Sequence, residues 1–441
     1  MKISICAGGD ITLLEHFSEG EGYDVNKIRE AMTIDGRPCD IRIANLESVV
    51  SSWNCHASAF CGGQWINTEP ERLDDIEKFG FNLYGCANNH SMDYSFQGCL
   101  STMRELEKRG MIFAGIGASL SESSKAAIYE IPEKNVRVAF ICVTSTFVDA
   151  ARAGDERDGI PARPGINPLR VQTKYKVTKE RFMQLQKIAE VTYINGERDN
   201  ARKIGSLPPE EEGSINFGRN FFVAVEDEEA EGKFTYCNKN DYERIMNEIQ
   251  QTSKLADYVV VSVHSHQIRK NSYTEPDYFQ EEFAHGCIDC GACAVIGTGT
   301  HQLKPIEIYK GKPIFYSLGN FVFQNDKIKK LPADFWDKYQ YPARLTVEEG
   351  MARKTRGGSI GLETDKNNYL SVVPIMEFEQ DRLIQLGLLP ISLQFEQESR
   401  WKGLPVIADE TDAELICLTL SRISQKYGTE FERQKYIKVK L

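Results

Sequence analysis

Acidic, amide and histidine side chains stand at the ends of five predicted strands. The five polar signatures are Gly9-Asp10, Asn45-Leu46-Glu47, Asn88-Asn89-His90, His264-Ser265-His266 and Gly297-Thr298-Gly299-Thr300-His301. Ligands of open α/β sheets bind outside the carboxyl ends of the strands, so these side chains should converge. Mixed oxygen and imidazole ligands without thiolates suit Mn, Fe or Zn. The sequence therefore predicts a site for one or two divalent metal ions.

The order of the signatures is that of two-metal phosphoesterases, in which one carboxylate bridges the ions and a water between them becomes the nucleophile. A divalent ion lowers the pKa of its bound water, so that a hydroxide can attack a phosphoryl or acyl centre near neutral pH. Each signature alone also suits a turn, a helix cap or a loop histidine, and it is their common position at strand ends that favours a metal site.

The elements that would position these residues alternate between strands and helices, which is typical of an α/β fold. Apolar runs predict strands at 2–7, 41–46, 82–87, 136–143, 257–263, 294–297, 359–363 and 368–377, with a hairpin at 305–317. Helical periodicity covers 69–79, 94–109, 178–191, 241–255, 277–288 and 413–427. The alternation weakens at about 150–240, which we interpret as an insertion, and 326–357 is expected to be irregular.

Composition excludes several classes of protein. The chain has 441 residues, of which 41% are hydrophobic and 27% charged, as in ordinary globular proteins. The net charge of −11 argues against nucleic acid and anionic membranes as partners, and no apolar stretch is long enough for membrane insertion. We expect a small-molecule or peptide substrate, and the oligomeric state is left open. The opening residues leave no room for a secretion segment, so we expect a cytoplasmic location.

The polar signatures lie in segments that resemble the CapA (PgsA) family of poly-γ-glutamate capsule-synthesis proteins. The resembling segments are GGDITL, IANLESVVS, CANNHSMDYSFQG, VVVSVHSHQ and GTGTHQLKPIEIYKGKPIFYSLGNFVFQ. The resemblance implies the four-layer α/β/β/α sandwich of calcineurin-like metallophosphoesterases, with an insertion and a C-terminal extension. It implies a metallophosphoesterase domain over 1–325, interrupted at about 150–240, and an extension over 326–441 that packs on it.

The resemblance also implies roles for individual residues. The metal ligands would be Asp10, Glu47, Asn89, His264 and His301, with Glu47 as the bridge. His90 would protonate the leaving group or stabilise the transition state, and Asp93 would orient it.

Three further positions are possible members of the site. Thr298 stands where the family usually carries a histidine, which would remove one ligand of one ion. His266 could take that place, line the site or stand behind it. Asn320 follows a strand and could support the ligands from behind.

Three functions remain open at this stage. The first is a CapA-like metal-dependent hydrolase or transferase of poly-γ-glutamate or capsule metabolism. The second is a peptide epimerase, in which Asp10 and His301 would exchange a Cα proton beside a metal-polarised carbonyl. The third is a non-catalytic assembly factor that uses the same site only for binding.

The other cysteines and histidines are interpreted as structural. Cys287, Cys290 and Cys293 have helical spacing and no recognisable fourth ligand, which favours buried thiols over an iron–sulfur site. Cys55 and Cys61 flank His56 in an aromatic loop that we expect to cover the site. The remaining assignments are structural histidines at His16, His56 and His285, and a solvated acidic loop at Glu226 to Glu231.

Overall fold

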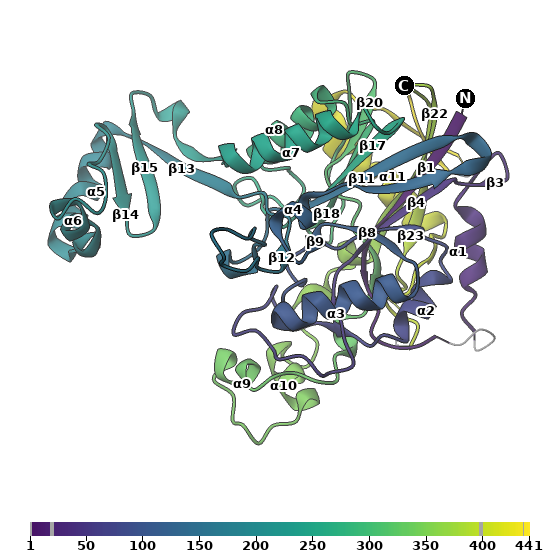
Figure 1. The fold of residues 1–441 in the computed structure, drawn as a ribbon, viewed down its shortest axis with the longest axis horizontal. Helices are drawn as coiled ribbons and strands as arrows, with labels where there is room; N and C mark the ends of the chain where they lie inside the picture. The colour runs from purple at the N-terminus through teal and green to yellow at the C-terminus, as the bar shows by residue number, and fades with distance from the viewer. Residues whose placement is uncertain (1, 18–21, 397–399, 435) are drawn as a thin grey trace.

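Two stacked β-sheets form the centre of the molecule in a computed structural model that describes residues 2–17, 22–396, 400–434 and 436–441 (Figure 1). The larger sheet has the order β25 (Phe431–Arg433), β26 (Ile437–Val439), β23 (Arg382–Ser392), β22 (Leu370–Glu379), β1 (Lys2–Thr12), β4 (Ile41–Leu46), β7 (Leu83–Gly85) and β8 (Ile112–Ala114). β21 (Asn320–Phe323) pairs with β1, and β24 (Val406–Ile407) pairs with β23. The smaller sheet has the order β10 (Ala127–Ile131), β11 (Val136–Thr144), β17 (Tyr258–Ser265), β18 (Ala294–Gly299), β20 (Lys312–Phe315) and β19 (Ile306–Tyr309).

Helices cover the outer face of each sheet. The larger sheet packs against α1 (Val25–Ala31), α2 (Arg72–Glu77) and α3 (Ser95–Lys108), and the smaller one against α7 (Lys239–Thr252) and α8 (Tyr278–Asp289). A third apolar core lies between the sheets, and α11 (Glu410–Ser424) contacts strands of both. This confirms the predicted four-layer α/β/β/α sandwich. No helix in the described ranges combines the length and apolar character needed to cross a membrane.

The strand β11 shows why the sequence folds into these layers. Its residues after Arg137 are all buried, so the strand reads as a continuous apolar run. Successive side chains of a strand point to opposite faces. Val138 and Phe140 accordingly belong to the core between the sheets, whereas Ala139 and Ile141 belong to the core under α7 and α8. The two faces of this strand therefore contribute to two different apolar cores, one on each side of the smaller sheet.

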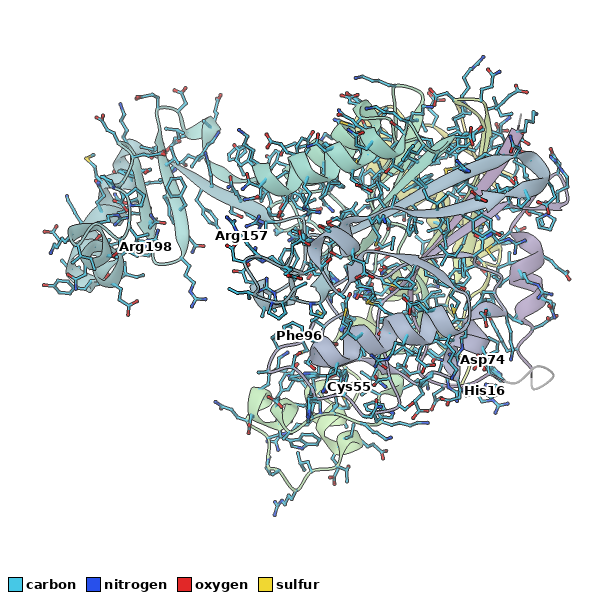
Figure 2. The ribbon with its side chains drawn as sticks, viewed as in Figure 1. His16, Cys55, Asp74, Phe96, Arg157 and Arg198 are labelled. Atoms are coloured by element: carbon cyan, nitrogen blue, oxygen red, sulfur yellow. The ribbon has the colours of Figure 1, made fainter. Side chains whose placement is uncertain are left out.

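The predicted insertion contains a small lobe that projects from the body (Figure 1). Its sheet has the order β14 (Ser214–Phe217), β15 (Asn220–Val225), β13 (Val171–Thr178) and β16 (Gly232–Cys237), accompanied by α5 (Lys179–Thr192) and α6 (Gly196–Lys203). Figure 2 shows Arg198 on this lobe and Arg157 on the loop between the lobe and the body. The helix expected at 178–191 is confirmed, but the strands around it were not predicted.

The segment after residue 325 differs from its prediction in two places. Residues 326–357 are not irregular throughout, because they contain α9 (Asp334–Tyr339) and α10 (Val347–Lys354). The strand expected at 359–363 is wrong, since a 3-10 turn (Leu362–Thr364) occupies this region. The following strands β22 and β23 pair directly beside β1 in the larger sheet. The domain boundary at 325 stays a prediction.

Candidate metal centre

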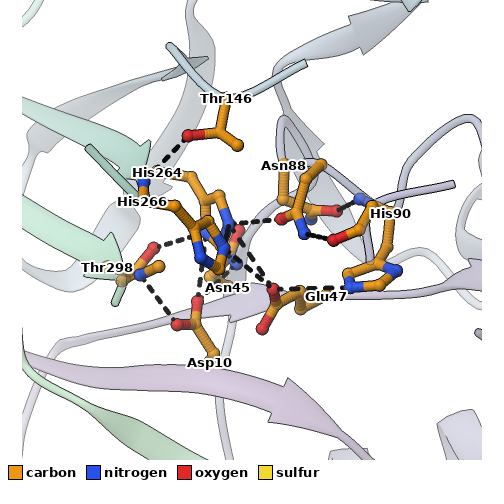
Figure 3. A network of polar contacts seen from close by, with 12 residues as sticks. Asp10, Asn45, Glu47, Asn88, His90, Thr146, His264, His266 and Thr298 are labelled. Carbon is orange, nitrogen blue, oxygen red and sulfur yellow. Dashed lines mark hydrogen bonds and ion pairs between the residues drawn. The ribbon is translucent and has the colours of Figure 1, made fainter. Parts of the chain in front are cut away.

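The pairing of parallel strands brings the polar signatures to one end of the sandwich. In the larger sheet, Asp10 on β1 is in register with Asn45 on β4 and with Asn320 on β21. In the smaller sheet, His264 on β17 is in register with Thr298 on β18. The two sheets present these strand ends to each other, as Figure 3 shows. The convergence expected from the sequence is therefore present at this edge.

Glu47, directly after β4, lies at the centre of this group. Its side chain is buried, with 1% of the residue exposed, and within the described ranges neither carboxylate oxygen has a hydrogen-bond partner. Three imidazole Nε2 atoms surround Oε1, at 3.4 Å for His264, 3.8 Å for His266 and 3.9 Å for His90. A buried carboxylate without partners is costly unless a cation compensates its charge. The surroundings of Glu47 therefore fit a bound cation.

Glu47, His266 and His301 can offer one ligand atom each, with all three atoms within 4.8 Å of one another. Burial lowers the pKa of both histidines, and the nearby His264 lowers that of His266 further. A low pKa keeps an imidazole neutral, which is the form that binds metals. Two imidazoles and one carboxylate suit Zn, Mn or Fe. His266, whose role the sequence left open, thus joins the group, together with the predicted ligands Glu47 and His301.

His301 is held in place by Asn320. The Nδ1 atom of His301 lies 2.9 Å from the amide oxygen of Asn320, whose own amide nitrogen donates to the carbonyl of Asn368 at 2.9 Å. The backbone of His301 is in the left-handed region, with φ of 60°, which non-glycine residues seldom adopt. Such conformations persist where the surrounding structure fixes them, often in functional sites. Because Nδ1 of His301 is bound to Asn320, the other ring nitrogen, Nε2, points away from Asn320.

Asp10 and His264 form a more enclosed part of the centre. The carboxylate of Asp10 accepts hydrogen bonds from the side chain of Asn45 at 2.7 Å and from the backbone of Gly299 at 2.9 Å. Burial opposes the charge of Asp10, but His264, with Nδ1 3.4 Å away, outweighs it and lowers the pKa of Asp10 to about 2. Asp10 is therefore charged, and each of its carboxylate oxygens accepts a hydrogen bond from the protein.

His264 is fully buried and connects several of the predicted site residues. Its Nδ1 lies 3.0 Å from the hydroxyl of Thr298, and its Nε2 lies 2.6 Å from the amide oxygen of Asn89 and 3.1 Å from Nε2 of His266. His264 thus contacts the two other predicted ligands Asp10 and Asn89 beside Glu47. Thr298 has a supporting role in the centre, because its hydroxyl fixes the ring of His264.

His90 and Asp93 form a buried pair on the other side of Glu47. Nδ1 of His90 lies 2.7 Å from a carboxylate oxygen of Asp93, which also accepts from the backbone N–H groups of Gly62 and Ile66. Burial lowers the pKa of His90, but the Asp93 carboxylate outweighs this effect and raises it. Nε2 of His90 faces the Glu47 side of the site. The pair has the geometry of an oriented acid.

A cavity of about 360 Å³ opens onto the centre. Four of its lining residues, which we call the floor, belong to the centre: Glu47, His90, His266 and His301. The remaining lining residues are Thr12, Gly62, Gly63, Gln64, Ile66, Tyr273, Thr300, Phe323, Asn325, Lys354 and Leu362. Asp10, Asn89 and His264 do not line it. Substrate atoms can therefore reach Glu47, His90, His266 and His301 most directly.

Several residues of the site were not singled out by the sequence. Asn45 stood in a polar signature without an assigned role, and its amide binds Asp10. Gln64 follows the Gly62-Gly63 pair, which is a turn signal but carries no indication of a site. Lys354 lies in the segment that was expected to be irregular, so nothing in the sequence connected it with the cavity.

The aromatic loop with Cys55 and Cys61 packs near α3, where Figure 2 shows Cys55 and Phe96 close together, and against α9 and α10. Its continuation at Gly62, Gly63 and Gln64 lines the cavity, so the loop borders the site.

Among the described residues, no cysteine joins a group of side chains with metal-ligand spacing. Cys287 and Cys293 are buried in different apolar cores, which confirms buried thiols at these two positions.

The three histidines interpreted as structural lie outside the centre. His16 pairs with Asp75 at 2.7 Å, and His285 pairs with Glu307 at 3.0 Å. His56 is exposed. In the acidic loop, Glu226 and Glu231 form ion pairs with Lys179 and Arg181 of α5, so this loop is tied to the projecting lobe.

Comparison with known proteins gives a consistent result. Residues 4–325 match the family described as bacterial capsule synthesis protein PGA_cap. The uncharacterized protein y4sH of Sinorhizobium fredii is 31% identical over 437 residues, which cover 97% of this chain and 90% of that protein. The PGA biosynthesis protein CapA of Bacillus subtilis is 26% identical over 260 residues, covering 58% of this chain and 47% of CapA.

A probable polyglutamine synthesis accessory protein of Mycobacterium tuberculosis is 22% identical over 403 residues, which cover 90% of this chain and 76% of that protein. The match to the family model includes all of the residues that form the centre around Glu47. Because this match covers well over half of its length, the chain belongs to the PGA_cap family of bacterial capsule synthesis proteins.

Proposed function

We propose that the chain is a metal-dependent hydrolase or transferase that acts on a peptide or related small molecule of poly-γ-glutamate or capsule metabolism. The observation that carries the proposal is the buried Glu47 carboxylate, which lacks hydrogen-bond partners among the described residues and faces the imidazoles of His264 and His266. Together with His266 and His301 it supplies a ligand set for Mn, Fe or Zn. One ion would be held by these three residues, and a second would need Asp10, Asn89 and His264.

A divalent ion at this position supplies an activated water or polarises a carbonyl or phosphoryl oxygen of the substrate. The protein contributes the proton transfer. His90, whose pKa the Asp93 carboxylate raises, can donate a proton from Nε2 to the leaving group. As the leaving group departs, the Asp93 carboxylate keeps the ring in one tautomer, because Nδ1 remains bound to it.

The remaining residues fix geometry. Asn320 orients His301, and Thr298 with Asn89 orients His264. The carbonyl of Gly62 accepts a hydrogen bond from the side-chain amide of Asn89, and the N–H of Gly62 donates to the carboxylate of Asp93. The position of this loop therefore depends on both side chains. Preorganised groups of this kind lower the cost of reaching the transition state.

Peptide epimerisation with Asp10 and His301 as the proton-exchanging pair is less well supported. Both carboxylate oxygens of Asp10 accept hydrogen bonds, and Asp10 does not line the cavity. A group that exchanges a Cα proton must reach the substrate within about 3 Å. His90, which lines the cavity with an oriented ring, is the better proton donor.

The proposal is tested by loading the full chain with Mn²⁺, Fe²⁺ or Zn²⁺ and assaying phosphoester and γ-glutamyl peptide substrates. We expect turnover that disappears on chelation and returns with the metal. Glu47→Gln provides the matched variant, since it keeps the shape of the side chain but removes the charge. Metal binding without turnover on any substrate would favour the non-catalytic alternative, and absence of metal binding would contradict the proposal.

A further inference from the structure

A lysine from the segment after residue 325 lines the cavity above the metal centre. Lys354 ends α10, and among the described lining residues it is the one lysine or arginine. Its Nζ donates a hydrogen bond to the side-chain oxygen of Gln64, which also lines the cavity. Gln64 is buried, and its amide nitrogen contacts the sulfur of Met351 at 2.9 Å. The ammonium group is therefore held at the cavity wall.

The charge of Lys354 has no direct partner. Within the described ranges no carboxylate forms an ion pair with its Nζ, although Glu363 lies near enough to favour the charged form. Burial lowers the pKa of Lys354, and the neighbouring Lys338 adds to this effect. A half-buried ammonium group is costly where its only hydrogen-bond acceptor is an amide. An anion in the cavity would relieve this cost.

Lys338 of α9, which contacts the same loop, is a useful contrast. Its Nζ donates to the carbonyl of Gly63 at 2.7 Å, but it does not line the cavity. Two lysines of α9 and α10 thus bind the loop of Gly63 and Gln64 from the extension, and one of them faces the site. Both lie beyond residue 325, where the match to the family ends. The lysine of the cavity wall therefore comes from the segment after residue 325.

We infer that Lys354 binds an anionic group of the substrate, a carboxylate or a phosphate, while another part of the substrate occupies the floor at Glu47, His266 and His301. This inference rests on the proposed function, because it assumes that the floor holds the metal. The chain as a whole has a net charge of −11, which repels anions at long range. A cation at the cavity wall provides the local attraction that an anionic substrate needs. The substrate class is thus an anionic peptide or ester rather than a neutral one.

The inference is tested by calorimetry on the full chain loaded with Mn²⁺. Acetate, whose single carboxylate cannot bind at Lys354 and at the floor together, is compared with dicarboxylates of three to six carbons and with 3-phosphonopropionate. We expect Lys354→Met to weaken binding of the best two-ended anion, meaning one with a charged group at each end, by about 10- to 100-fold. The loss of a hydrogen bond to a charged group typically has an effect of this size. Binding of acetate and of Mn²⁺ should not change. A loss confined to 3-phosphonopropionate would identify the anion as a phosphate, and a loss for the dicarboxylates as a carboxylate.

Two matched variants separate charge from structure. Lys354→Arg keeps the charge and should retain most of the affinity, whereas Lys310→Met removes the charge of an exposed lysine that does not line the cavity and should have no effect. Equal affinity of wild type and Lys354→Met for every two-ended anion would overturn the inference alone. Failure of wild type to bind Mn²⁺ would overturn the proposed function, and the inference with it.

Discussion

His301 is anchored by Asn320, whose amide oxygen lies 2.9 Å from Nδ1 of the imidazole. The two residues come from different elements, since His301 follows β18 and Asn320 begins β21. Asn320 is itself fixed, because its amide nitrogen donates to the carbonyl of Asn368. Metal-binding histidines commonly donate their second ring N–H to such a partner, which sets the tautomer and the ring orientation. The contact therefore leaves Nε2 of His301 available for the metal ion that we propose.

The first prediction is that Asn320→Ala lowers the affinity for Mn²⁺ by about 10- to 100-fold, as is typical when the partner of a ligating histidine is removed. Calorimetry on the metal-free protein measures the change. Asn320→Asp retains an oxygen acceptor and should bind Mn²⁺ more tightly than Asn320→Ala. Asn367→Ala, on an exposed neighbouring residue, is the control. Unchanged affinity in Asn320→Ala would show that His301 needs no support.

The second prediction concerns the cost of burying Glu47. Glu47→Gln should lose the metal, because a neutral amide is a poor replacement for a carboxylate ligand. The metal-free variant should nevertheless be more stable than the metal-free wild type, since a buried carboxylate without partners is removed. We expect the free energy of unfolding to rise by about 1–3 kcal/mol. Urea denaturation in the presence of a chelator measures it, and a less stable variant would contradict the interpretation.

The third prediction separates proton transfer from metal binding. His90→Ala should retain the metal and lower kcat by about 10²- to 10⁴-fold, the usual value of a general acid. Asp93→Asn should have a similar effect through the wrong orientation of the ring, because Asp93 holds Nδ1 of His90 at 2.7 Å. Metal content and turnover are measured on the same preparations. Loss of metal from His90→Ala would instead make His90 a ligand.

The positions of the polar signatures could be predicted from the sequence because polar residues follow strongly apolar runs, although β1 continues to Thr12 instead of ending at residue 7. The strand at 41–46 agrees with β4, and the helix expected at 94–109 agrees with α3 within one residue at each end. Such elements have one clear face or are wholly buried, so hydrophobic periodicity alone defines them. The same signal placed Asp10, Glu47 and His264 at one edge of the sandwich.

The role of His266 could not be predicted, because it depends on the path of the chain after its strand. β17 ends at Ser265, and His266 then donates its backbone N–H to the hydroxyl of Thr146, which turns the chain towards the cavity. The side-chain position of a residue beyond a strand end is set by such local contacts rather than by alternation. Its neighbour His264, inside the strand, followed the alternation as expected.

The strands of the projecting lobe and the two helices after residue 325 were missed for a different reason. In β13 none of the residues is fully buried, so its alternation separates half-buried from exposed side chains and gives a weak signal. The helix α10 is short, but it begins with a capping box formed by Thr346 and Glu349. This pattern is visible in the sequence and could have indicated the helix. The contact between its last residue, Lys354, and Gln64 depends on tertiary packing alone.

The fourth prediction is that two metal ions bind with unequal affinity. The ligand atoms of Glu47, His266 and His301 converge, whereas Nε2 of His264 is already bound to the amide oxygen of Asn89 at 2.6 Å. A second ion must displace that contact, so its site should be weaker. Calorimetry should resolve one tight and one weaker event, and Asn89→Ala should remove the weaker one. Two equal events in wild type would show that the hydrogen bond imposes no penalty.

The fifth prediction follows from a lysine buried close to the site. Lys304 is fully buried, and its Nζ donates to the carbonyl of Gln267 and to the side-chain oxygen of Gln280, each at 3.0 Å. Burial lowers its pKa from 10.5 to about 7, and the attraction of Asp277 offsets only part of this effect. Above about pH 7 the folded protein has released this proton, whereas the unfolded chain keeps it up to about pH 10.5. The unfolded state then binds more protons, so the contribution of Lys304 to the free energy of unfolding rises with pH over this window.

Lys304→Met isolates this contribution, because the other titrating groups are common to both proteins. Below pH 7 the wild type carries the full cost of a buried charge in the folded state, which the variant lacks. Between pH 7 and about pH 9 the wild type should gain about 2–3 kcal/mol relative to the variant, at about 1.4 kcal/mol for each pH unit. Denaturation of both proteins across this range, with Lys310→Met on an exposed lysine as the control, measures the difference. A difference that stays constant with pH would mean that Lys304 remains charged in the folded protein throughout, held by Gln267 and Gln280.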